Sequence, residues 1–109
     1  MKKISSEERK AIHVASVFAS NFTNHMLTLS KNILTQNSLS FDLLKPLVSE
    51  TINNSLALGP EKNQTGPARD GELEILDQHV DLLQEDERVA HLYRMISQHI
   101  IDMYVDENI

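Results

Sequence analysis

A long stretch without glycine or proline constrains the fold of this chain more than any other feature of its sequence. Ser5 and Glu8 stand at the spacing of a capping box, which predicts that a helix begins there. Apolar residues then recur at steps of three and four, the pattern of one helical face: Ile12, Ala15, Ala19, Phe22, Met26, Leu29 and Ile33. The pattern predicts one helix to about Gln36, roughly 30 residues and ~45 Å long.

Three shorter helices are predicted after the long one. Ser40 is placed to cap a second helix that runs to about Ala57, with an irregular first turn around Pro46. The glycine- and proline-rich segment 58–71 is a break, and a third helix opens at its end, at Asp70 or Gly71. A fourth helix follows the polar joint 84–87. The sequence thus predicts an all-α fold: one helical domain over residues 1–109, with about four or more helices, the first one long.

Charge and composition exclude several classes of function. A net charge of −6 argues against binding to nucleic acid or anionic membranes, which needs clustered Lys and Arg. Without cysteine there is neither a disulfide nor a thiolate site. The start Met1-Lys2-Lys3-Ile4 lacks the apolar stretch of a signal peptide, and no apolar run approaches the ~20 residues of a membrane span. We therefore expect a cytoplasmic protein.

The five histidines show no metal-binding pattern. His91 and His99 share a helical face but lie ~12 Å apart along the axis, and His13 and His25 lie ~18 Å apart. A single metal ion, with ligands at ~2.3 Å, therefore cannot bind both histidines of either pair. No metal site is predicted, and His79 is interpreted as a helix-packing or loop-anchoring group.

Small and amide side chains gather in the middle of the long helix. The candidate residues there are His13, Ser20, Asn21, Asn24 and His25. Asn21 and His25 are four residues apart, so they are expected to share a helical face. Two interpretations stay open: these groups bond to neighbouring helices or face solvent, or they line a cleft and present amides and an imidazole to a polar substrate.

The turn Thr65-Gly66-Pro67 is a second candidate site. A Gly-Pro turn ahead of a helix exposes backbone N–H groups that suit an anion or a carbonyl oxygen, although such turns are common. The sequence contains no Gly-x-Gly-x-x-Gly, no phosphate loop and no Ser-His-Asp arrangement. From these residues alone, the chain is a helical interaction module.

Several sequence blocks together resemble a known family. They are HVASVFASNFTNH at 13–25, FDLLKPL at 41–47 with Glu50-Thr51, QTGPA at 64–68, and His79. In this order and spacing they resemble the uncharacterised C-terminal domain that follows a Rossmann-like domain in a group of bacterial proteins classed as oxidoreductases. These are similar to pyrroline-5-carboxylate reductase, ketopantoate reductase and the β-hydroxyacid dehydrogenases. The resemblance spans about residues 9–101, and Asn-Phe-Thr-Asn-His is typical of the Bacteroides group.

The resemblance implies a fold like the C-terminal domain of 6-phosphogluconate dehydrogenase. In such enzymes the Rossmann domain holds NAD(P), and the helical domain supplies the dimer interface and the substrate side of the cleft. It implies that this chain is the C-terminal part of a larger protein and binds no cofactor itself. Its expected partners are its own N-terminal Rossmann domain, a second copy in a homodimer and a small-molecule substrate. By itself the chain is expected to be inactive.

This sequence departs from the related enzymes at two places. The β-hydroxyacid dehydrogenases carry a catalytic Lys one helical turn before an Asn of the long helix, whereas Val17 and Ser20 stand four residues before Asn21 and Asn24. That general acid is absent, so His13 and Asn21 become the catalytic candidates. The candidate substrate-binding residues are Ser20, Asn24, His25, Thr65, Gly66 and Pro67. Arg69 stands one residue earlier than the Arg of many family members, so we assign it no anion-binding role.

Three functional hypotheses follow. The leading one is the substrate-binding and dimerisation domain of an NAD(P)-dependent oxidoreductase. The alternatives are a non-catalytic dimerisation or interaction module and a helical sensor that binds a small acid without reaction. The residues select neither a substrate nor between NAD and NADP.

Overall fold

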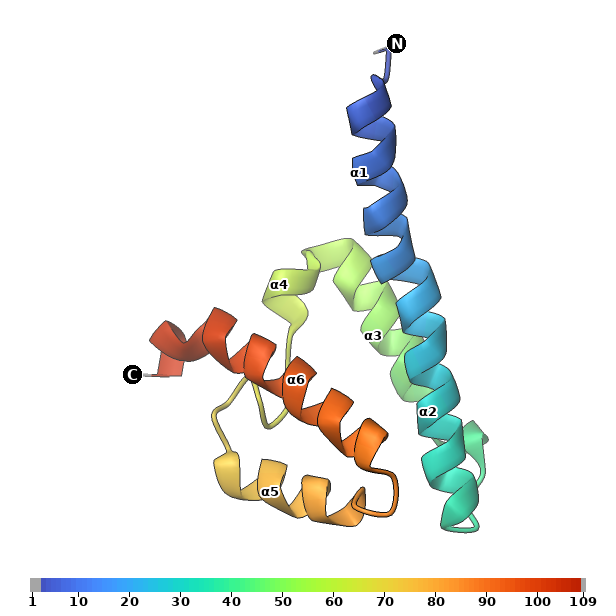
Figure 1. The fold of residues 1–109 in the computed structure, drawn as a ribbon, viewed down its shortest axis with the longest axis vertical. Helices are drawn as coiled ribbons and strands as arrows, with labels where there is room; N and C mark the ends of the chain where they lie inside the picture. Colours follow the sequence, from blue (N-terminus) through green and yellow to red (C-terminus); the bar gives the residue numbers. More distant parts are fainter. Residues whose placement is uncertain (1–2, 109) are drawn as a thin grey trace. The chain divides into compact units, whose positions relative to one another are not determined.

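All regular elements in the part of the chain that the structure describes, residues 3–108 of a computed structural model, are helices (Figure 1). The predicted all-α class and the long first helix are confirmed. Met1 and Lys2, at the start of the segment that lacks a signal-peptide pattern, lie outside the described residues. The elements are α1 Ser6–Ser16, η1 Val17–Phe22, α2 Thr23–Gln36, η2 Phe41–Leu44, α3 Lys45–Leu58, α4 Pro60–Asn63, α5 Leu73–Leu82, α6 Glu87–Tyr104 and η3 Val105–Asn108.

The long helix is the run α1–η1–α2, which continues without a break for 31 residues (Figure 1). Its start is the predicted capping box: the Glu8 N–H donates to Ser5 Oγ at 3.1 Å, and the Ser5 N–H donates to Glu8 Oε1 at 3.2 Å. At its end the Leu39 N–H donates to the Leu34 carbonyl at 2.8 Å, while Ser38 takes a left-handed φ of 59°. Both helix ends therefore follow from local residue chemistry.

The middle of this helix differs from the prediction, because Val17–Phe22 is a π-helix. Its i→i+5 hydrogen bonds span one residue more than the i→i+4 hydrogen bonds of an α-helix. It therefore rotates the residues before it by about 100° relative to those after it, since one α-helical residue spans that angle. Directly before it the Ser16 hydroxyl donates to the Ile12 carbonyl at 2.7 Å, a bond that weakens and bends helices. The expected single apolar face from Ile12 to Ile33 is thus interrupted.

The contacts divide the chain into two compact units, the first of which runs to Pro46. In this unit α2 packs on the short helix η2, and half-buried side chains from both face each other. Ser40 caps η2 as predicted, accepting from the Asp42 N–H at 3.1 Å. The irregular first turn near Pro46 is also confirmed: it is a 3-10 turn that changes to α-helix at Lys45. Lys45 pairs with Asp42 at 2.7 Å, which lowers the pKa of that carboxyl.

The second unit starts at Leu47 and contains a short helix, α4, inside the predicted break. Gly59 has a φ of 94° and ends α3, and the following proline begins α4. The Asn63 amide then donates to Ser55 Oγ at 3.0 Å and to the Thr51 carbonyl at 3.3 Å. These bonds fold α4 back onto α3, so the segment between the second and third predicted helices is more ordered than expected.

Helix α5 begins at Leu73, later than the expected Asp70 or Gly71. The residues before it form turns of their own: the Asp70 N–H donates to the Gly66 carbonyl at 3.1 Å, and the Glu72 N–H to the Pro67 carbonyl at 2.8 Å. Helix α5 then packs against α6. Asp86, in the predicted polar joint, caps α6 through the backbone N–H groups of the two residues after Glu87.

Burial is slight throughout the described residues. The buried apolar side chains are Ala68, Leu76, Ala90 and Tyr104, all in the second unit. Tyr104 is the central anchor, because its hydroxyl donates to the Glu61 carbonyl at 2.8 Å and Arg69 lies over its ring at 4.8 Å. Arg69 also pairs with Glu107, so it has a structural role at this end of α6. None of the described helices combines the length and apolar character that crossing a membrane requires.

Replacing Tyr104 with Phe should destabilise the second unit. The change removes the hydroxyl and leaves the Glu61 carbonyl without this donor, so we expect a loss of about 1 kcal/mol in the free energy of unfolding. Urea unfolding followed by circular dichroism measures it. Met103→Leu, at the exposed neighbouring position, is the control and should change stability by less than about 0.5 kcal/mol. Equal stabilities of the two variants would contradict the anchor role.

Deleting Ala19 should convert the π-helix into continuous α-helix at little cost. The residues that rotate are almost all exposed, so we expect the free energy of unfolding to change by less than about 0.5 kcal/mol. Deleting Leu29, which is half-buried in α2, rotates packed residues and should cost at least about 1 kcal/mol. Thermal and urea unfolding of both variants measure these losses of stability. A larger loss for the Ala19 deletion than for the Leu29 deletion would disprove the π-helix assignment.

Candidate functional site

The predicted residues of the long helix all lie at or beside the π-helix. Ser20 and Asn21 belong to η1, His13 lies one turn before it in α1, and Asn24 and His25 begin α2. All five are exposed. Within residues 3–108, none of these five side chains makes a hydrogen bond or an ion pair. Of the two interpretations, bonding to neighbouring helices is therefore not observed in this part of the chain, and the polar groups face solvent.

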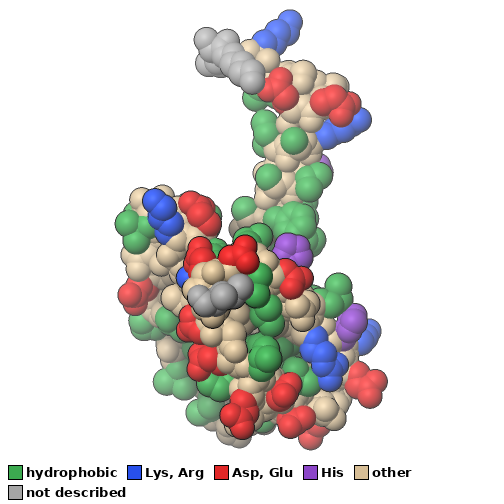
Figure 2. Space-filling model, turned by 90° about the vertical axis from the view of Figure 1, so that its left-hand side faces the viewer, with side chains coloured by type: hydrophobic (Ala, Val, Ile, Leu, Met, Phe, Trp, Pro, Cys, Tyr) green, Lys and Arg blue, Asp and Glu red, His purple; other side chains and the backbone are tan. Residues whose placement is uncertain are grey.

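Two aromatic rings accompany these polar groups on η1. Phe18 and Phe22 contact each other edge to face, with ring centroids 4.9 Å apart and an interplanar angle of 77°. They are 64% and 46% exposed, unusually high values for phenylalanine. The long helix carries further apolar side chains on its surface, seen in green near the N-terminus in Figure 2. Exposed polar side chains and two exposed aromatic rings thus lie on the same short π-helical segment.

The second predicted set, Thr65-Gly66-Pro67, lies in the second unit. Thr65 is exposed, and Gly66 takes a φ of 103°, which explains the glycine. The turn does not lead directly into a helix, because α5 begins six residues after Pro67. The turn thus lies ahead of a helix, as expected, but further from its start than the predicted opening at Asp70 or Gly71 implied. Its carbonyls are engaged instead: the Gln64 amide donates to the Thr65 oxygen at 3.1 Å.

His79 has the packing role that the sequence indicated. Its Nδ1 lies 2.7 Å from the Tyr93 hydroxyl, and the two rings meet edge to face at 5.8 Å. The pair joins α5 to α6. Among the described residues, no three His, Cys, Asp or Glu side chains gather closely enough to hold a metal ion.

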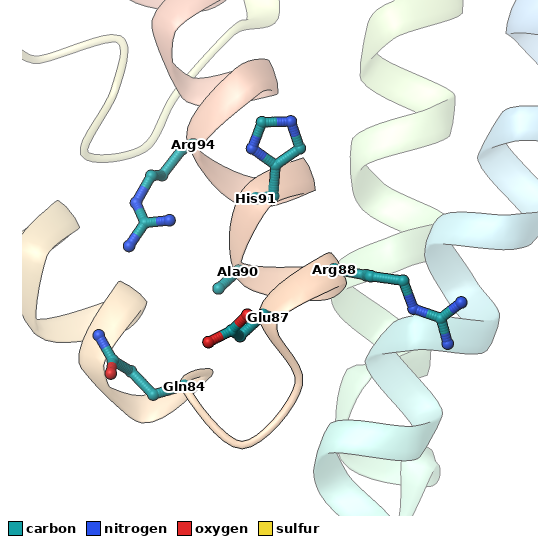
Figure 3. A pocket seen from close by; sticks show the side chains of 6 residues that line it. All are labelled: Gln84, Glu87, Arg88, Ala90, His91 and Arg94. Atoms are coloured by element: carbon teal, nitrogen blue, oxygen red, sulfur yellow. The ribbon is translucent and has the colours of Figure 1, made fainter.

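A surface hollow that the sequence did not predict lies at the turn from α5 to α6. It encloses about 580 Å³ and is lined by Gln84, Glu87, Arg88, Ala90, His91 and Arg94 (Figure 3). Ala90 is 3% exposed and forms its floor, whereas the other lining residues are exposed. The sequence signal was the spacing of Arg88, His91 and Arg94, three charged or polar residues at steps of three in an acidic chain.

The Tyr93 hydroxyl should make stability fall at alkaline pH. Burial raises the pKa of Tyr93 above its usual value of 10.0, while a hydrogen bond with Ser97 lowers it in part. The folded state then holds the proton more tightly than the unfolded state, so the stability is present below about pH 10 and is lost as the pH rises through the folded-state pKa. The free energy of unfolding, measured with urea between about pH 8 and 11, should fall more steeply with rising pH for the wild type than for Tyr93→Phe. Parallel curves would contradict this assignment.

Comparison with known proteins shows what this chain is similar to. Residues 1–100 match the model of the domain of unknown function DUF2520. No curated protein matches the chain. A crystal structure described as a "putative NADP oxidoreductase" from Bacteroides fragilis is 37% identical, with a TM-score of 0.88 over 93% of this chain.

This chain spans only 39% of the length of the Bacteroides fragilis protein. The family match covers most of the chain and includes the first structural unit, most of the second, the polar residues of the long helix and the turn at 65–67. The chain therefore belongs to the DUF2520 family.

Proposed function

We propose that this chain is the substrate-binding and dimerisation domain of an NAD(P)-dependent oxidoreductase. One observation carries the proposal: nearly the whole chain is similar to a protein described as an NADP oxidoreductase, yet it corresponds to less than half of that protein. The remaining length of such a protein is where a Rossmann domain would hold the nucleotide. The domain then acts in the cytoplasm, without nucleic acid or membrane partners, and is inactive by itself.

The polar residues around η1 support the substrate-binding part. Asn21 offers an amide, and His13 offers an imidazole whose ring nitrogens can donate or accept a hydrogen bond. Neither side chain is engaged within the described residues. In the proposed site the bound nucleotide supplies hydride, while His13 and Asn21 polarise a substrate oxygen. Ser20, Asn24 and His25 bind other parts of the substrate, and the Thr65-Gly66-Pro67 turn, which lies in the second unit, is a separate substrate-binding candidate.

The alternative is a non-catalytic dimerisation or interaction module. The observation that favours it is the number of large apolar side chains exposed on the long helix: Ile12, Val14, Phe18 and Phe22. Exposed apolar surface of this kind marks protein–protein contacts. A homodimer is common to both proposals, so only the effect of the polar residues on turnover separates them.

The longer reading frame provides the test. Upstream of this chain it should encode a strand followed by Gly-x-Gly-x-x-Gly, and a stop codon there would refute the oxidoreductase proposal. In the full-length protein, NADPH consumption is followed with a panel of oxo acids and cyclic imines. His13→Ala and Asn21→Ala should each lower kcat/KM at least about 100-fold, because each removes a proton donor or an oxygen-polarising group.

Matched controls are available at other exposed positions. Asn32→Ala and His99→Ala remove the same side chains from exposed positions on α2 and α6 and should leave turnover unchanged. Size-exclusion chromatography should show every variant as the same dimer. Loss of the dimer in His13→Ala or Asn21→Ala would favour the interaction module.

A further inference from the structure

We propose that the hollow at the turn from α5 to α6 binds a small zwitterion, a molecule that carries a carboxylate and an ammonium group. This site is distinct from the residues of the long helix and does not depend on the proposed oxidoreductase function. Its two principal contacts are Arg94 and Glu87, which line the hollow from the same helix (Figure 3).

The hollow has a well-defined frame. Asp86 caps α6 at its base, with Oδ1 accepting from the Arg88 N–H at 3.1 Å and the Val89 N–H at 3.3 Å. The turn before it is closed by the Asp86 N–H, which donates to the Leu83 carbonyl at 3.0 Å. Because Ala90 is small and buried, the longer side chains around it form walls rather than filling the space.

Two side chains of opposite charge, Glu87 and Arg94, line the hollow and do not pair with each other. Gln84, Glu87 and Arg94 extend toward the same side of α6, whereas Arg88 extends toward the other side (Figure 3). Within the described residues, neither the Glu87 carboxylate nor the Arg94 guanidinium makes a side-chain hydrogen bond or an ion pair. They stand seven residues apart, about two helical turns or ~10 Å along the axis, which leaves room for a ligand between them.

This arrangement selects the class of ligand. The Arg94 guanidinium has the planar donor geometry that binds a carboxylate through two parallel hydrogen bonds. The Glu87 carboxylate suits an ammonium group, and the Gln84 amide can donate or accept. A simple anion would be repelled by Glu87 and a simple cation by Arg94, whereas a zwitterion pairs with both.

Titration of the 109-residue chain, followed by amide NMR spectra, tests the proposal. The probes are glycine, β-alanine and 4-aminobutyrate, which differ in the spacing of their charges. Acetate and methylammonium serve as half-ligands at matched ionic strength. We expect saturable shifts confined to residues 84–94 for at least one zwitterion, with half-saturation at a concentration at least about tenfold below that of either half-ligand.

Substitutions then assign the contacts. Arg94→Gln and Glu87→Gln should each weaken zwitterion binding at least about tenfold, and Glu87→Gln should bind acetate more tightly than the wild type does. Arg9→Gln on α1 and Glu85→Gln in the turn are the matched controls and should leave binding unchanged. All four positions are exposed, so the spectra should retain the folded pattern.

Three outcomes would overturn the proposal. They are the absence of saturable shifts at 84–94 with every zwitterion, equal binding of acetate and the zwitterions, and unchanged binding in Arg94→Gln. The second outcome would identify a simple anion site instead. Since none of these measurements uses NADPH or the longer protein, their failure is separate from failure of the proposed function.

Discussion

The small amount of apolar surface that these helices bury on their own is the constraint on which the rest of the structure depends. The four buried apolar side chains among the described residues all lie in the second unit, and the 31-residue helix carries none of them. Each unit is therefore held by a few specific contacts: α2 on η2 in the first, and Tyr104 with the His79–Tyr93 pair in the second. On α3, Leu56 remains 82% exposed, so the shortage of burial is not limited to the long helix.

The parts of the fold that could be predicted are those governed by neighbouring residues. Ser5 with Glu8, Ser40 and Asp86 cap helices through bonds to residues two or three positions away, and a sequence pattern records such bonds directly. Helix α4 was missed because it depends on Asn63 reaching back to α3 and on the Glu61 carbonyl meeting Tyr104, 43 positions along the chain. Such distant partners leave no periodic signal.

The candidate sites also differ in how far the sequence could predict them. The exposed polar residues of the long helix could be identified because amides and histidines are unusual in an apolar helical pattern. The hollow at 84–94 could not, because it needs the turn after α5 to place Gln84 beside the second turn of α6. The Thr65-Gly66-Pro67 turn could be recognised from its Gly-Pro pair, but the later start of α5 could not, since residues 68–72 make turns that the residue pattern did not predict.

The π-helix at Val17–Phe22 also bears on how sequences of this family should be aligned. A helix accepts a single inserted residue without breaking only by widening one turn, so a π segment is the trace that such an insertion leaves. A relative with one residue fewer between the positions of Ser16 and Thr23 would have a straight helix there. Its counterpart of His13 would then match a different number in this chain. Residue-by-residue comparison across the middle of the long helix therefore requires a gap placed by structure rather than by sequence identity.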